Sequence, residues 1–154
     1  MATQLGDQLV EGYRRYPIED HGKLRYQYFS VAALAVAYAQ NDQIELFKLP
    51  PGRKRILPNA CRLWTSAWGA SRTFSLGHRA YMKNPSPGAL EAEAATAFIN
   101  ALDVSSAVNA AAWSSTVPKF DIYSLQEVTC FATIGGGTMP VAATLSGYCA
   151  YIYE

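Results

Sequence analysis

The residues of this chain best suited to chemistry are its cysteines and histidines. Cys61, Cys130 and Cys149 form no C-x-x-C pair, and His21 and His78 are far from them and from each other. A zinc site normally draws on closely spaced pairs of such ligands. Each cysteine falls in an apolar run, where a free thiol behaves as a small hydrophobic side chain. We therefore expect buried, reduced cysteines and no metal or other cofactor.

Other catalytic patterns are missing from the sequence. It contains no G-x-S-x-G, P-loop or H-E-x-x-H motif. His78 follows the apolar side of a strand pattern, which favours a core or interface histidine. Glu91 and Glu93 would point apart on a helix and make a poor acid–base pair. The glycine run 135–137 lacks the lysine and the helix of a phosphate cradle and indicates a hairpin turn. We expect no enzyme.

The composition is that of a globular domain. Half of the 154 residues are hydrophobic, 16% are charged and the net charge is +1. A chain of this length can bury a core as one domain, and its near-neutral charge argues against nucleic acid or an anionic membrane as the main partner. The N-terminus shows no secretory signal, and the apolar run from Val31 to Tyr38 is too short to cross a bilayer. We expect synthesis in the cytoplasm.

Most of the chain alternates apolar and polar residues with a period of two, which predicts strands. The expected strands are Gln27–Ala39, Gln43–Leu49, Ile56–Trp68, Arg72–Met82, Lys119–Ser124, Glu127–Ile134 and Val141–Tyr153. The run from Leu90 to Leu102 is rich in helix formers and predicts one short helix or an irregular excursion. Residues 105–118 read as a loop that Trp113 anchors to the core.

These elements predict a single all-β domain, a β-sandwich or jelly-roll-like barrel. Residues 1–28 are polar and show no sustained period, so we expect an extended N-terminal arm before a sandwich of residues 29–154. The arm is either a loose tail or a segment laid on a partner.

Two tryptophans are the first candidates for an interaction surface. If the strand face that carries Cys61 is the core, then Trp64 and Trp68 lie outside with Arg62. Tryptophan and arginine are enriched at protein interfaces. The opposite assignment stays open, and a bulge near Ser66 would turn one of the tryptophans inward.

A basic cluster of Arg53, Lys54 and Arg55 follows the turn at residues 50–52. It reads either as a solvated loop tip or as a contact to an acidic protein surface. Nucleic acid is the weakest alternative, because neither an aromatic RNA-binding strand motif nor a basic helix accompanies the cluster.

The segments KLPPGRKRILPNACRLWTSAWGASRTFSLGHRAYM, ALDVSSAV and KFDIYSLQEVTCFATIGGGTMPVAATLSGYCAYIYE resemble structural proteins of tailed bacteriophages of the capsid decoration, or cement, type. In that group a strand ending in L-P-x-G leads to G-A-S-x-T-x-x-x-G-x-R-A-Y, then D-V-S-x-A, a glycine-turn hairpin and a closing L-x-G-Y-x-x-Y strand. The matching positions here are Leu49, Pro50 and Gly52, Gly69–Ser71, Thr73, Gly77, Arg79–Tyr81, Asp103–Ser105, Gly135–Gly137, Leu145, Gly147, Tyr148 and Tyr151. The resemblance covers residues 24–154.

The resemblance implies a sandwich or jelly-roll body that binds the major capsid protein on the outer face of an assembled shell, often as a homotrimer. It implies a location on the virion surface after synthesis in the host cytoplasm, while the near-neutral charge and the short apolar run lead us to expect no nucleic-acid or membrane partner. The expected contact residues are Arg62, Trp64 and Trp68, with polar and arm contacts from Arg53, Lys54, Arg55, Tyr13, Arg14, Arg15 and Tyr16. The alternatives are a minor head or tail subunit, or a carbohydrate-binding module that uses its tryptophans as stacking platforms.

Overall fold

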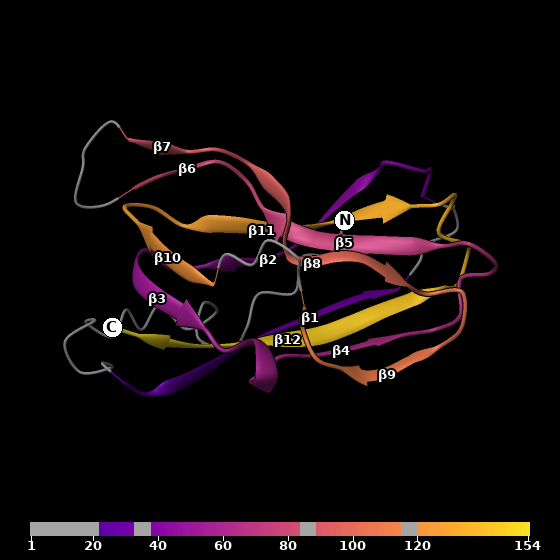
Figure 1. The fold of residues 1–154 in the computed structure, drawn as a ribbon, viewed down its shortest axis with the longest axis horizontal. Helices are drawn as coiled ribbons and strands as arrows, with labels where there is room; N and C mark the ends of the chain where they lie inside the picture. Colours follow the sequence, from indigo (N-terminus) through magenta and orange to yellow (C-terminus); the bar gives the residue numbers. More distant parts are fainter. Residues whose placement is uncertain (1–21, 33–37, 84–88, 115–119) are drawn as a thin grey trace.

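The computed structural model describes residues 22–32, 38–83, 89–114 and 120–154, and within them the fold is all-β. The strands are β1 (Leu24–Ala32), β2 (Gln43–Leu49), β3 (Gly52–Ile56), β4 (Arg62–Thr65), β5 (Thr73–His78), β6 (Tyr81–Met82), β7 (Leu90–Glu91), β8 (Ala94–Asp103), β9 (Val108–Ala111), β10 (Asp121–Ser124), β11 (Val128–Gly135) and β12 (Thr144–Tyr153). The predicted all-β sandwich-like fold is confirmed (Figure 1).

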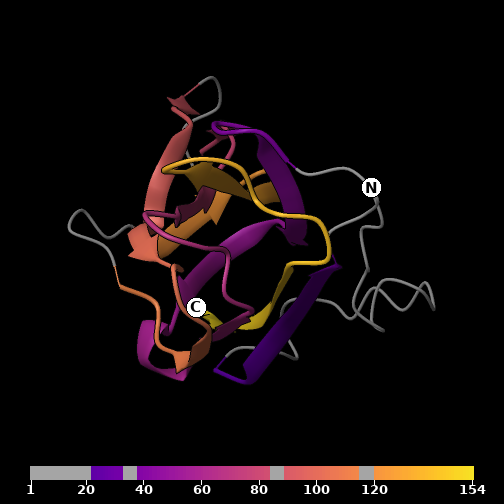
Figure 2. The same cartoon turned by 90° about the vertical axis from the view of Figure 1, so that its right-hand side faces the viewer.

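Two antiparallel sheets form the layers of the sandwich. The larger has the order β10-β3-β12-β4-β9, with β1 on the remaining edge of β12, and the smaller has the order β2-β11-β5-β8. A separate two-stranded ribbon, β6-β7, projects at one end. The end-on view in Figure 2 shows the strands of the two sheets on opposite sides of the core.

The last strand, β12, organises the larger sheet. Along one edge it pairs with β1 from Leu24↔Ile152 to Ala32↔Thr144. Its other edge is shared, because β4 pairs with residues 145–148 and β3 with residues 151–153. The strand alternates accordingly, with Leu145 and Cys149 buried in the core and the intervening side chains on the outer face. The core is filled by such inward residues from both sheets.

The predicted helix at Leu90–Leu102 is wrong, since the segment forms β7 and most of β8. No α-helix occurs in the four described ranges. β8 pairs with β5 through two register shifts and buries Ala97, Phe98 and Ile99. The pairing and this burial outweigh the helix propensity of its alanines, because tertiary context overrides intrinsic preference.

Further boundaries differ from expectation: the predicted strand Arg72–Met82 is divided into β5 and β6, and the strand predicted from Val141 begins at Thr144. The predicted strand Ile56–Trp68 is shorter, since β3 ends at Ile56, a single 3-10 turn covers Pro58–Ala60 and β4 ends at Thr65. The loop expected at residues 105–118 contains β9. β1 begins at Leu24, so the predicted boundary between arm and domain falls inside a paired strand.

Several expectations about single side chains are confirmed. All three cysteines are buried and unpaired. Trp113 is buried, with its ring centroid 5.7 Å from that of Phe98 and 6.2 Å from that of Phe47. His78 is a core histidine whose ring lies 5.2 Å from Tyr81 and whose Nδ1 is 2.9 Å from the carbonyl oxygen of Arg79.

Candidate interaction surface

Aromatic side chains gather on the outer face of β1, β12 and β4. We call Tyr26, Tyr28, Tyr148 and Trp64 the aromatic ridge. The strand registers bring them together, because Tyr28 lies opposite Tyr148 and Trp64 opposite Ser146. In antiparallel strands, alternate residues face the same side, so this register places all four rings outside the core.

Tyr148 is the centre of the ridge. Its ring centroid lies 5.4 Å from that of Tyr26, 5.6 Å from that of Tyr28 and 5.9 Å from that of Trp64. Tyr26 and Tyr28 are 46% and 59% exposed, whereas Trp64 and Tyr148 are half-buried. Contiguous exposed aromatic side chains are typical of protein interaction surfaces, so the aromatic ridge is the candidate interaction surface.

Trp64 and Trp68 do not share a face. Trp64 lies outside, as expected, but Trp68 is buried, which corrects its predicted place on the outer face. The strand alternation ends at Thr65, and the backbone N–H of Trp68 then donates to the carbonyl of Val104 at 2.9 Å. The indole Nε1 donates to the carbonyl of Thr144 at 3.4 Å, and the ring packs 6.1 Å from Phe74.

Arg62 borders the aromatic ridge, since it pairs with Tyr148 in register. Its Nη1 donates to the carbonyl oxygens of Asn59 and Cys61, at 2.6 and 2.8 Å. The side chain is therefore held beside the 3-10 turn and half-buried. Because its guanidinium already binds these two carbonyl oxygens, Arg62 mainly stabilises the backbone conformation of the residues that lead into β4.

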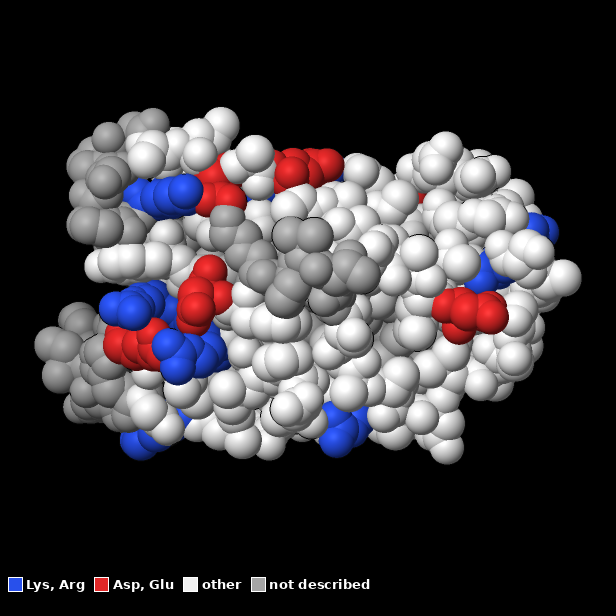
Figure 3. Space-filling view, in the orientation of Figure 1, with Lys and Arg blue, Asp and Glu red and all other residues white. Residues whose placement is uncertain are grey.

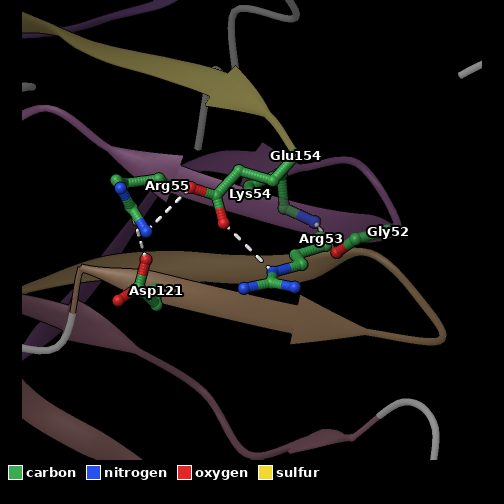
Figure 4. A network of polar contacts seen from close by, with 6 residues as sticks. All are labelled: Gly52, Arg53, Lys54, Arg55, Asp121 and Glu154. Carbon is green, nitrogen blue, oxygen red and sulfur yellow. Dashed lines mark hydrogen bonds and ion pairs between the residues drawn. The ribbon is translucent and has the colours of Figure 1, made fainter. Parts of the chain in front are cut away.

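The basic cluster lies on β3, not at a loop tip, and its members point in different directions (Figure 4). Arg53 Nε and Arg55 Nη2 both bind the Glu154 carboxylate, at 3.0 and 2.8 Å. Arg55 Nε also binds Asp121 Oδ1 at 3.0 Å, and this contact raises the pKa of Arg55. In Figure 3 the network forms a patch of mixed charge at one end, while much of the surface in view is uncharged.

Lys54 is buried between these arginines, which corrects its expected place in an exposed basic cluster that is either solvated or in contact with an acidic protein surface. Its ammonium donates to the carbonyls of Pro50 and Gly52, the latter at 2.9 Å, and lies 3.3 Å from Ser124 Oγ. Burial lowers the pKa of Lys54 to about 8. Lys54 is therefore a structural residue that ties β3 to the Pro50 turn and to β10.

The sequence reasoning missed the three tyrosines of the aromatic ridge. Tyr26 falls in the predicted arm, and Tyr28 falls both in that arm and in the predicted strand Gln27–Ala39, although the spacing of the two tyrosines around Gln27 has the period of a strand. Tyr148 is part of the closing L-x-G-Y motif, but its partners come from strands distant in sequence. Tyr13, Arg14, Arg15 and Tyr16 lie outside the described residues.

The described residues contain no group of three or more histidine, cysteine, aspartate or glutamate side chains placed to hold a metal ion. Nor do they include a helix that is long and apolar enough to span a membrane.

No protein-family model and no curated protein matches the sequence. Solved structures with a similar fold come from phage capsids. A chain of the cyanophage Pam1 capsid asymmetric unit matches with a TM-score of 0.59 and 15% identity over 87% of each chain. A chain of the capsid of Ralstonia phage GP4 matches with a TM-score of 0.63 and 15% identity, over all of this chain and 92% of that one. The protein thus shares its fold with chains found in two phage capsids.

Proposed function

We propose that this protein is a virion structural protein that binds the outer surface of an assembled phage capsid and stabilises it. The observation that carries the proposal is the fold that this chain shares with chains of two phage capsids, over nearly the full length of each compared chain. The turn motifs that resemble decoration proteins support the same reading. The aromatic ridge supplies a surface for the contact.

The ridge suits a binding role because its aromatic side chains are large and rigid. Tyrosine and tryptophan bury much area with few rotatable bonds, so ordering them on binding costs little side-chain entropy. Tyr28 is the most exposed of the four and would lose the most surface to a partner. Its ring packs against the half-buried Tyr148, which in turn packs against the half-buried Trp64.

Stabilisation would follow from linkage. A protein that binds the assembled shell but not its separated subunits stabilises the shell by mass action. If the protein trimerises, three linked sites bind with avidity across neighbouring capsid subunits. No catalysis is required, and the major capsid protein is the partner.

The test mixes the purified protein with expanded capsids that lack it. Co-sedimentation and a higher capsid melting temperature are the expected results. The decisive variant is Tyr26→Ala with Tyr28→Ala, which removes the exposed half of the aromatic ridge. Tyr123→Ala is the matched control, because Tyr123 is a 37% exposed tyrosine on β10 outside the ridge. Absence of wild-type binding, together with an unchanged capsid melting temperature, overturns the proposal.

A carbohydrate-binding module is the second candidate, and the aromatic ridge is the observation that favours it. Exposed aromatic rings can stack on sugar faces as well as on protein. A glycan array screened with wild type and with the Tyr26→Ala, Tyr28→Ala variant separates the two. Sugar binding that depends on these tyrosines, without any effect on capsids, would replace the capsid proposal. A minor head or tail subunit remains the alternative if the protein co-purifies with virions but does not bind the shell.

A further inference from the structure

Two of the three cysteines are neighbours across adjacent strands. Cys61 directly precedes β4, and β4 pairs with β12 in a register that ends at Arg62↔Tyr148. One further step in the same register would place Cys61 opposite Cys149. Both side chains are fully buried on the inner side of the sheet, and Cys61 Sγ lies 3.7 Å from the carbonyl oxygen of Ala150, the residue that follows Cys149.

The alternation of the ladder shows which kind of pair they form. The N–H of Ser66 donates to the carbonyl of Thr144 at 3.1 Å, which marks a hydrogen-bonded pair. Hydrogen-bonded and non-hydrogen-bonded pairs alternate along an antiparallel ladder. Cys61 lies five residues, an odd number, before Ser66, so Cys61 and Cys149 form a non-hydrogen-bonded pair. In agreement, the N–H of Cys61 is directed to the carbonyls of Leu57 and Pro58, at 3.1 and 3.2 Å, and not to β12.

This pair type has the spacing that a disulfide needs. Opposed residues of a non-hydrogen-bonded pair have Cα atoms about 4.5 Å apart and bring their side chains close together. Disulfides span Cα separations of roughly 4.4–6.8 Å. The two sulfurs can therefore bond with little movement of either strand.

The two thiols also differ in their surroundings. The N–H of Ala150 donates to Cys61 Sγ at 3.2 Å. The pKa of Cys61 is lowered, first by its interaction with the neighbouring Cys149 thiol and further by this N–H and nearby Arg62. Burial raises the pKa of Cys149. The N–H donated to Cys61 Sγ favours its thiolate, so Cys61 is the candidate for attack and Cys149, beside it, is the candidate to resolve its oxidised form.

We propose that Cys61 and Cys149 form an intramolecular disulfide when the protein meets a hydroperoxide. The Cys61 thiolate attacks one oxygen of hydrogen peroxide, the O–O bond breaks, and the departing hydroxide takes a proton to leave as water. The Cys149 sulfur then attacks the resulting sulfenic sulfur, the S–S bond forms and the S–O bond breaks. The Cys149 proton leaves with that oxygen as a second water. One peroxide is reduced and two thiols are oxidised.

The link would join β4 to the closing strand and restrict the unfolded chain over a long loop, which raises stability. The disulfide would form once the protein leaves a reducing compartment and would then hold the two strands together. Cys130 is the internal control, a third buried cysteine that should keep its free thiol. It lies on β11 in the other sheet, and burial raises the pKa of its thiol.

The experiment compares protein treated with hydrogen peroxide and protein kept in reductant. We expect the thiol titre of the unfolded protein to fall from three to one, with the loss of two hydrogen atoms in the intact mass. A non-reducing digest should join the peptides of Cys61 and Cys149. The melting temperature should rise by several degrees and return when reductant is added.

Cys130→Ala and Cys149→Ala are matched variants, because each removes one fully buried thiol. The first should keep the mass loss and the rise in melting temperature, and the second should lose both. If Cys149→Ala does not fold, the digest of the wild-type protein decides alone. A link that includes Cys130, a link between two molecules, sulfinic acid at Cys61, or three unchanged thiols each overturns the proposal.

Discussion

Tyr28 and Tyr148 lie directly opposite each other on β1 and β12, with ring centroids 5.6 Å apart. This cross-strand pair joins an exposed tyrosine from near the start of the described chain to a half-buried one near its end. Trp64 extends the contact to a third strand. The closing strand thus builds the core with one face and the proposed binding surface with the other.

The first prediction concerns Tyr28. Since its side chain is 59% exposed, Tyr28→Ala should change the free energy of unfolding by less than about 1 kcal/mol. If the aromatic ridge is the capsid contact, the same change should weaken capsid binding by roughly 30-fold, the effect of an interface hot spot. Urea unfolding and co-sedimentation titration measure the two quantities. Equal weakening by Tyr123→Ala would show that the ridge has no special role.

The second prediction concerns Lys54. Its pKa is about 8 in the folded protein and 10.5 in the unfolded chain. Between these values the unfolded state binds more protons, so stability rises with pH, by about 3 kcal/mol from this group alone. Below pH 8 both states are protonated and the full cost of burying the charge remains.

Urea unfolding of wild type and Lys54→Met at pH 7.5 and pH 10 checks this sign. The wild type should gain stability relative to the variant at the higher pH. Lys48→Met is the control, because Lys48 forms only a 4.0 Å contact with Glu127 and both side chains are more than 40% exposed. A difference between wild type and Lys54→Met that does not change with pH would contradict a buried, titrating ammonium.

The third prediction concerns Gly77, where β5 and β8 approach closely. A Cβ at Gly77 would overlap the backbone carbonyl of Ala94, and backbone cannot rotate away as a side chain can. Gly77→Ala should therefore cost about 3 kcal/mol or more, or prevent folding. Gly69→Ala is the comparison, because Gly69 has a φ of +102° but open space around it. It should cost only about 1 kcal/mol. Equal costs in thermal unfolding would disprove the close approach.

The sequence predicted the parts of the fold that depend on local alternation. The strands around Leu46, Leu76 and Ile134 were found because one face of each is buried and the other is not. β8 was missed because its alanines favour a helix in isolation, and only pairing with β5 makes it a strand. The paired residues of β5 and β8 are too far apart in the sequence for the local residue pattern to reveal their pairing.

The candidate surface was predicted in part for the same reason. Trp64 followed the strand period, whereas Trp68 lies just beyond the end of β4, where the backbone turns toward Val104. The tyrosines of the aromatic ridge could be seen as strand residues, but their meeting with Tyr148 depends on the register of β1 against β12. Burial of Lys54 also depends on a distant residue, Ser124.

The last prediction concerns Arg72, which holds the glycine turn between β11 and β12. Its Nε donates to the carbonyl of Thr138 at 3.0 Å and its Nη1 to that of Gly136 at 2.8 Å. Arg72→Ala removes both bonds and should lower the free energy of unfolding by about 1–3 kcal/mol. Arg72→Lys should not restore it, because an ammonium cannot reproduce the forked geometry of a guanidinium.

Urea unfolding and amide hydrogen exchange in β11 and β12 together test this role. Exchange should accelerate near Met139, whose N–H donates to the carbonyl of Tyr38 at 2.9 Å just after the turn. It should stay unchanged at β10, which lies in the other sheet from β11 and is separated from β12 by β3. Lys48→Ala serves as the control for loss of a surface cation, with an expected change below about 0.5 kcal/mol. If Arg72→Ala is no more destabilising than this control, the arginine does not hold the turn, and the glycine backbone alone fixes it.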